Sequence, residues 1–129
     1  MMTPAPKKIV IVEDQPEVAD LLEEMLSIDP YQVVKIHSST GALSMIQAEK
    51  PDLVLLDIMM PDVPGLEVLR YMRREPGLQK TPVVIVSAKS QPVDIRTGLE
   101  AGATAYLTKP VDITTLRETV AQVIRELEG

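Results

Sequence analysis

Five short apolar runs recur along the chain, each bounded by polar or turn-forming residues. They are residues 9–12, 32–36, 53–56, 82–86 and 105–107. Short runs rich in β-branched residues predict strands, and unbroken runs are typical of strands buried on both faces of a parallel sheet. The run at 32–36 is the least apolar, so we expect it at an edge of the sheet.

Apolar residues recur at helical spacing after each of these runs. We expect a helix from Pro16 towards Asp29-Pro30, a second after residues 38–40 that ends before Pro51, a third before Pro76-Gly77, a fourth from Pro92, and a fifth capped by Asp112. The expected buried residues are Val18, Leu21, Leu22, Met25 and Leu26, then Ala42, Leu43 and Ile46, then Leu66, Leu69 and Met72, and finally Leu116, Val120, Val123, Ile124 and Leu127.

Two of these helices carry further expectations. The hydroxyl side chains at residues 38–40 are candidate caps for the second helix. The fourth helix has few apolar anchors, chiefly Ile95 and Leu99, and Gly98 weakens it. We therefore expect the fourth helix to be the least firmly held.

Strands that alternate with helices predict an α/β fold with a parallel sheet, helices on both faces and right-handed crossovers. We expect a doubly wound, five-stranded parallel sheet in the order 2-1-3-4-5, the flavodoxin-like (βα)5 arrangement. The 129 residues suffice for one core. We expect one domain over residues 7–129, preceded by a flexible, Pro-rich tail at residues 1–6.

Composition excludes several classes of protein. The formal charge is −6 and aromatic residues are only 2% of the chain, which argues against direct nucleic-acid binding. There is no cysteine, so disulfides and cysteine-ligated metals are excluded. No apolar run approaches the roughly 20 residues that span a bilayer, and the first residues lack a signal-peptide pattern, so we expect no membrane association and a cytoplasmic location.

Chemically distinctive side chains follow four of the five apolar runs. Glu13-Asp14 follow the first run, Asp57 follows the third, Ser87 follows the fourth, and Lys109 comes shortly after the fifth. Because the carboxyl ends of parallel strands meet at one edge of a doubly wound sheet, we expect these side chains to share one crevice.

Three carboxylates in one crevice repel one another unless a cation neutralises them. Magnesium suits such a site, since it takes oxygen ligands and keeps several waters. We expect Asp14 and Asp57 to ligate Mg2+ directly, the backbone carbonyl of Met59 to add an oxygen, and Glu13 to act through water.

The remaining groups favour phosphoryl transfer. Lys109 supplies a mobile positive charge and Ser87 a hydroxyl donor for phosphoryl oxygens. Asp57 can then act as the nucleophile while the cations stabilise charge on the equatorial oxygens, which gives an aspartyl phosphate.

Taken together, these motifs resemble the CheY-like receiver domain of two-component response regulators. The motifs are Glu13-Asp14, Asp57 with Met60-Pro61 and Gly65, Ser87-Ala88, Ala101-Gly102-Ala103 up to Tyr106, and Lys109-Pro110. The resemblance implies a phosphoacceptor switch, which catalyses at most its own phosphorylation and dephosphorylation. Asp57 would accept a phosphoryl group from a phosphohistidine of a sensor histidine kinase or a histidine phosphotransfer protein, with Mg2+ as cofactor.

The resemblance also implies an output. Ser87 and Tyr106 would act as switch residues, and the face formed by the fourth helix, fifth strand and fifth helix would change its preference for a downstream effector or a fused output domain. Dimerisation through the last helix or its neighbours is left open. Three departures from the usual pattern are Glu13 in place of Asp, Pro64 before Gly65, and Val111 where an aromatic is frequent.

Three other classes of protein fit the sequence less well. A flavin-binding protein shares the sheet order, but Glu13-Asp14 would repel its phosphate, and a haloacid-dehalogenase-type phosphatase needs an acid where Met59 stands. A receiver-like interaction module that is never phosphorylated is disfavoured because every reacting group is present. Taken singly, Asp57 could be a loop acid and Tyr106 a static packing residue. His37 is interpreted as a surface residue far from the acids, and Met45, Met59, Met60 and Met72 as packing residues.

Overall fold

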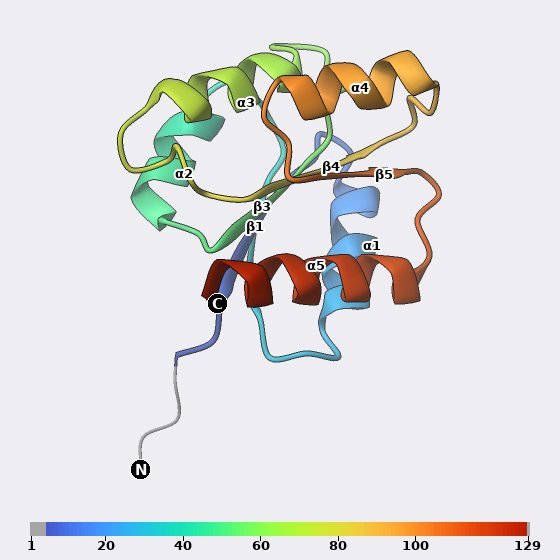
Figure 1. Cartoon of the computed structure of the whole chain (residues 1–129). Helices are drawn as coiled ribbons and strands as arrows, with labels where there is room; N and C mark the ends of the chain where they lie inside the picture. The colour runs from blue at the N-terminus through green and yellow to red at the C-terminus, as the bar shows by residue number, and fades with distance from the viewer. Residues whose placement is uncertain (1–4, 129) are drawn as a thin grey trace.

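The computed structural model describes residues 5–128, in which strands and helices alternate from end to end (Figure 1). The elements are β1 (Lys8–Val12), α1 (Pro16–Leu26), β2 (Gln32–Ile36), α2 (Ala42–Glu49), β3 (Leu53–Leu56), α3 (Gly65–Arg74), β4 (Val83–Ser87), α4 (Pro92–Glu100), β5 (Ala105–Thr108) and α5 (Ile113–Glu128). All the predicted elements are therefore present. Most of the predicted tail at residues 1–6 lies outside the described residues.

All strand pairs are parallel, and the sheet order is β2-β1-β3-β4-β5. This confirms the predicted fold class and the edge position of β2. Strand β1 pairs with both β2 and β3, so Val12 lies between Ile36 and Leu56 at the carboxyl ends of the three strands. The residues that follow these strands consequently meet at one rim of the sheet.

The sheet separates two hydrophobic cores, because successive side chains of a strand point to opposite faces. In β1, Ile9 and Ile11 pack under α1 and α5, whereas Val10 and Val12 pack under α2 and α3. Figure 1 shows the same division, with α1 and α5 on one side of the sheet and α2, α3 and α4 on the other. Strands buried on both faces explain why their sequences are apolar without alternation.

Met45 and Met59, which were interpreted as packing residues, are 43% and 50% exposed. Three further residues, expected on helices to be buried or to act as apolar anchors, are also exposed. Leu21 is 50% exposed because the packed stripe of α1 runs through Ala19, Leu22 and Leu26, and Leu21 instead borders an open pocket between α1 and the loop after β5. Leu127 is 50% exposed because residues 125–128 form an exposed last turn of α5.

The third is Leu99, which is 45% exposed. The buried residue of α4 is Gly98, where a Cβ atom would lie only 2.9 Å from the side chains of Ile85 and Tyr106. The glycine that weakens the helix in the sequence is thus the point where α4 approaches the sheet.

The predicted caps have opposite outcomes. Asp112 caps α5, since its carboxylate accepts a 2.7 Å hydrogen bond from the Thr115 amide. The hydroxyl residues at 38–40 do not cap α2. Its N-cap is Gly41, whose φ of 83° lies in the left-handed region that glycine adopts without strain, and no side chain caps the helix. The hydroxyls bind Asp62 instead.

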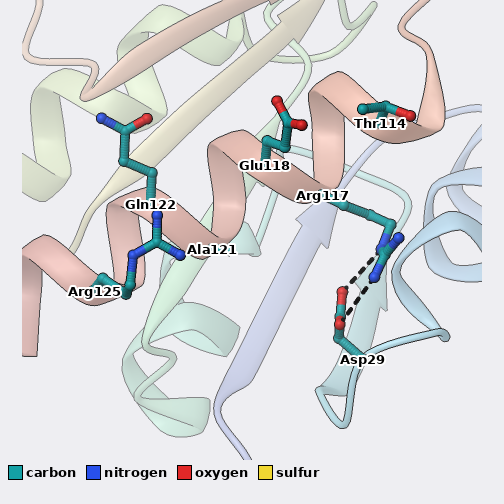
Figure 2. A pocket seen from close by; sticks show the side chains of 7 residues that line it. All are labelled: Asp29, Thr114, Arg117, Glu118, Ala121, Gln122 and Arg125. Carbon is teal, nitrogen blue, oxygen red and sulfur yellow. Dashed lines mark hydrogen bonds and ion pairs between the residues drawn. The ribbon is translucent and has the colours of Figure 1, made fainter.

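Helix α1 ends at Leu26, earlier than the pattern towards Asp29-Pro30 predicts. Asp29 instead lies in the loop after the helix, where it makes a two-pronged ion pair with Arg117 of α5, at 3.1 and 3.2 Å (Figure 2). This pair ties the α1–β2 loop to α5 beside a surface pocket that α5 lines along its length. Within residues 5–128, no helix is both long and apolar enough to cross a bilayer.

Candidate functional site

The predicted site residues lie at the carboxyl rim of the sheet. Glu13 and Asp14 follow β1, Asp57 follows β3, Ser87 ends β4 and Lys109 follows β5. Glu13, Asp57 and Ser87 are buried, with exposed fractions of 1%, 6% and 0%, whereas Asp14 is partly exposed. The rim therefore holds two buried acids with an opening to solvent beside them.

Three carboxylates converge there. Oxygen atoms of Glu13, Asp14 and Asp57 all lie within 4.8 Å of one another. Burial raises the pKa of Glu13, and the charge of Asp57 raises it further, while the hydrogen bond from Lys109 opposes both effects. This oxygen-only donor set, negatively charged and partly open, fits a hard divalent cation such as Mg2+.

Lys109 reaches into the same cluster. Its Nζ atom lies 2.6 Å from Glu13 Oε1 and 3.3 Å from Asp57 Oδ2. Burial alone would lower the pKa of Lys109, but the hydrogen bond to Glu13 and the charges of Asp57 and Glu13 outweigh it, so the pKa is raised. The ammonium is thus held between the two acids, closer to Glu13.

The loop after β3 orients Asp57. The Met59 amide donates a 2.9 Å hydrogen bond to Asp57 Oδ1, so one carboxylate oxygen is held by the backbone and the other faces Lys109. Gly65 packs directly on this loop, since a Cβ atom there would lie 2.5 Å from the Asp57 carbonyl oxygen and 2.6 Å from Ile58 Cα. The sequence showed Gly65 only as part of a motif, and the close approach that requires it becomes visible in the structure.

Ser87 and Tyr106 both contact Lys89, in the loop between β4 and α4. The Ser87 hydroxyl accepts a 3.2 Å hydrogen bond from the Lys89 amide, and the Tyr106 hydroxyl donates a 2.8 Å bond to the Lys89 carbonyl. Burial raises the pKa of Tyr106, and its interaction with Ser87 works in the opposite direction. Within residues 5–128, the Ser87 hydroxyl makes no hydrogen bond to Asp57 or Lys109, so it neighbours the acid cluster without joining it.

The sequence interpretation placed His37 far from the acids, and this is wrong. Its Nδ1 atom is 3.1 Å from the backbone carbonyl oxygen of Glu13. The reason is the parallel register of β1 and β2, which places Ile36 opposite Val12 and brings the next residue of each strand to the same rim. The ring is nevertheless exposed, as expected.

Comparison with known families decides the class of this site. The family model of the response regulator receiver domain matches residues 9–121. The chain belongs to this family. Receiver domains are phosphoacceptor switches of two-component signalling rather than classical enzymes; they generally bind Mg2+ and work with a histidine kinase or a phosphotransfer partner.

Solved structures of other receiver domains have the same fold. The BeF3-activated N-terminal receiver domain of Klebsiella pneumoniae RstA is 34% identical, with a TM-score of 0.85 over 92% of this chain and 98% of that one. Vibrio cholerae chemotaxis protein CheY4 is 26% identical, with a TM-score of 0.85 over 92% and 99%. The receiver domain of a Syntrophus aciditrophicus signal transduction histidine kinase is 30% identical, with a TM-score of 0.85 over 93% and 91%.

Proposed function

We propose that this receiver domain accepts a phosphoryl group on Asp57 from a phosphohistidine of a sensor histidine kinase or a histidine phosphotransfer protein. The proposal rests above all on the surroundings of Asp57. This buried carboxylate lies within 4.8 Å of two further acids and 3.3 Å from the Lys109 ammonium, at the rim where loops meet. Such a group can be a nucleophile only if the negative charge that gathers around it is offset.

The reaction is a direct transfer. A carboxylate oxygen of Asp57 attacks phosphorus, the bond between phosphorus and the imidazole nitrogen breaks, and the imidazole leaves with the electron pair. The hydrogen bond from the Met59 amide holds the carboxylate in one orientation for this attack. Orientation of this kind supplies much of the catalysis in phosphoryl transfer, because little other covalent chemistry is needed.

Four groups of this chain would hold Mg2+. They are the carboxylates of Asp14 and Asp57, the backbone carbonyl of Met59, and Glu13 acting through water. The indirect role of Glu13 agrees with its 2.6 Å contact to Lys109, which already occupies one of its oxygens. When bound, Mg2+ supplies positive charge that offsets the charge of the phosphoryl oxygens.

Lys109 supplies the second positive charge. Its long side chain lies between Glu13 and Asp57, so a phosphoryl group on Asp57 would attract it away from Glu13 by a small movement. An ammonium is suited to this because its charge is compact and its stem is flexible.

Ser87 and Tyr106 would pass the change to the face formed by α4, β5 and α5. A phosphoryl dianion on Asp57 would attract the Ser87 hydroxyl, which accepts a hydrogen bond from Lys89 in this structure. Because Tyr106 also bonds to Lys89, a movement of the β4–α4 loop alters the contact of Tyr106 at the same time. A downstream effector or an attached output domain would recognise the altered face.

The test is phosphorylation by a small-molecule donor. Incubation with acetyl phosphate and Mg2+ should add one phosphoryl group to the intact protein, measured by mass spectrometry. Asp57→Asn should abolish the addition, while Asp20→Asn, a matched change of an acid on the exposed side of α1, should leave it intact.

Equal labelling of Asp57→Asn and the unchanged protein would contradict the assignment of Asp57. Absence of labelling in the unchanged protein would favour an interaction module that is not phosphorylated. Continuous hydrolysis of many phosphate esters per protein would favour a phosphatase instead.

A further inference from the structure

One exposed carboxylate joins two loops of the rim. Asp62 lies in the loop between β3 and α3, and residues 38–40 lie in the loop between β2 and α2. Asp62 Oδ2 accepts hydrogen bonds from the Ser38 hydroxyl at 2.6 Å and from the amide and hydroxyl of Thr40, both at 2.8 Å. Asp62 Oδ1 accepts one from the Ser39 hydroxyl. These bonds together hold the pKa of Asp62 well below its usual range.

Ser39 adds a second connection to the same loop. Its side chain is buried, its hydroxyl oxygen accepts a 2.8 Å hydrogen bond from the Val63 amide, and it lies 2.6 Å from the Val63 carbonyl oxygen. A hydroxyl has one proton, so it donates either to Asp62 or to Val63 at any moment. The bond that Ser39 accepts from Val63 is retained in both cases. We call Asp62, Ser38, Ser39, Thr40 and Val63 the loop clamp.

The clamp holds a segment without regular secondary structure, which is otherwise anchored by the buried side chains of Ile58 and Met60 and by local hydrogen bonds. Residues 58–64 belong to no helix or strand. Pro61 and Pro64 have no amide proton to donate. Close to Asp57, the Met59 amide donates a hydrogen bond to the Asp57 carboxylate, and the Gly65 amide donates one to the Ile58 carbonyl at 3.2 Å. Towards Pro64, the only hydrogen bonds to another loop within residues 5–128 are those of Asp62 and Val63.

We propose that Asp62 and Ser39 are positioning residues for the phosphorylation site, and that they hold the β3–α3 loop so that the Met59 carbonyl is available to the cation. The inference rests on the proposed function. Met59 lies three residues before Asp62 and two after Asp57, so a shift of the clamped segment reaches both groups. Residues that orient metal ligands without touching the metal commonly change metal affinity by about 10-fold to 100-fold when they are replaced.

The negative charge of Asp62 could by itself attract a cation. The variants must therefore distinguish an effect of this charge on Mg2+ binding from an effect of the loop's position. Asp62→Asn removes the charge and keeps the shape. Ser39→Ala keeps every charge and removes the hydroxyl that bonds to both Asp62 and Val63. Glu118→Gln, an exposed acid on α5, is the matched control for the loss of one negative charge.

The experiment has two measurements on the full chain. Amide hydrogen exchange without metal reports the order of the loop. Titration with Mg2+, followed by the shifts of amide NMR signals, reports the affinity for Mg2+. NMR is chosen because the chain has no tryptophan whose fluorescence could report binding. Both Asp62→Asn and Ser39→Ala should speed exchange of the Met59 amide, which is bonded to Asp57, and weaken Mg2+ binding by about tenfold, the lower end of the range for such residues. Glu118→Gln should change neither.

Three outcomes are distinguishable. Weaker Mg2+ binding in Asp62→Asn with no change in Ser39→Ala would overturn the inference, because charge alone would then explain the effect. Unchanged exchange and affinity in both variants, with normal Mg2+ binding by the unchanged protein, would also overturn it. Failure of the unchanged protein to bind Mg2+ would instead contradict the proposed function.

Discussion

At the scale of single residues, the site depends on side-chain length as well as charge. Glu13 is one methylene longer than the aspartate that is usual at this position, and it reaches Lys109 at 2.6 Å, closer than Asp57 does at 3.3 Å. In the unphosphorylated protein the Lys109 ammonium therefore lies closer to Glu13 than to Asp57, the proposed nucleophile. The ion pair also compensates a carboxylate that is only 1% exposed, which would otherwise be costly to ionise.

Gly65→Ala is expected to damage the site through the backbone. The new methyl group would meet the carbonyl oxygen of Asp57 and the Cα atom of Ile58, and neither can rotate away. Overpacking of this kind costs about 1–3 kcal/mol in the free energy of unfolding. A displacement of about 1 Å at a reacting group can slow the chemistry by about 100-fold. Chemical denaturation and the rate of labelling by acetyl phosphate measure the two effects.

Gly77→Ala is the matched control for this prediction. Gly77 has φ of 92° but open space around its Cα atom, so alanine should cost about 1–2 kcal/mol in stability through backbone strain alone. Its rate of labelling should be unchanged. If Gly65→Ala were labelled as fast as Gly77→Ala, the close packing on Asp57 would be irrelevant to the chemistry.

The sequence predicted which residues meet at the rim, because that needs only the strand order and the position of each residue after its strand. Asp57, Glu13 and Lys109 converge for this reason. It did not predict the partners of residues 38–40 or the contact of His37 with Glu13. These depend on the path of loops and on neighbours across the sheet, about which hydrophobic periodicity carries no information.

At the scale of elements, α4 differs from the helices around it. It buries only Gly98, whereas α5 buries Leu116, Val120, Val123 and Ile124. Its few apolar anchors in the sequence agree with this small buried surface, but the role of the glycine was not predictable. Through Gly98 the helix rests on the ring of Tyr106, so the proposed switch residue and the proposed switch helix share a contact.

We expect α4 to open more readily than α5. Segments with few buried apolar contacts exchange through local openings, whereas well-packed helices exchange near the global limit. Native-state amide exchange should show protection at least about tenfold lower, or 1.4 kcal/mol, for residues 95–100 than for residues 116–124. Equal protection in the two helices would mean that α4 opens only with the whole domain, and it would then be a poor candidate for a switching element.

At the scale of the whole molecule, folding and the acid cluster are coupled. The three acids come from two segments, Glu13-Asp14 and Asp57, which lie more than forty residues apart and meet only because β1 and β3 pair in parallel. The charge of Asp57 opposes ionisation of Glu13 at this rim, and the hydrogen bond from Lys109 offsets part of this effect. A cation that binds the cluster should therefore bind the folded chain and not the unfolded one.

This coupling predicts that Mg2+ raises the stability of the whole domain. A ligand that binds only the folded state stabilises it by RT ln(1 + [L]/Kd), which is about 2.7 kcal/mol at a Mg2+ concentration of 100 times Kd. Thermal unfolding followed by circular dichroism should show the melting temperature rising with Mg2+ concentration, and the rise should be lost in Asp14→Ala. Sodium chloride at equal ionic strength controls for screening of the surface charges. An equal rise with sodium chloride, or in Asp14→Ala, would show that Mg2+ acts on the net charge of −6 rather than at the rim.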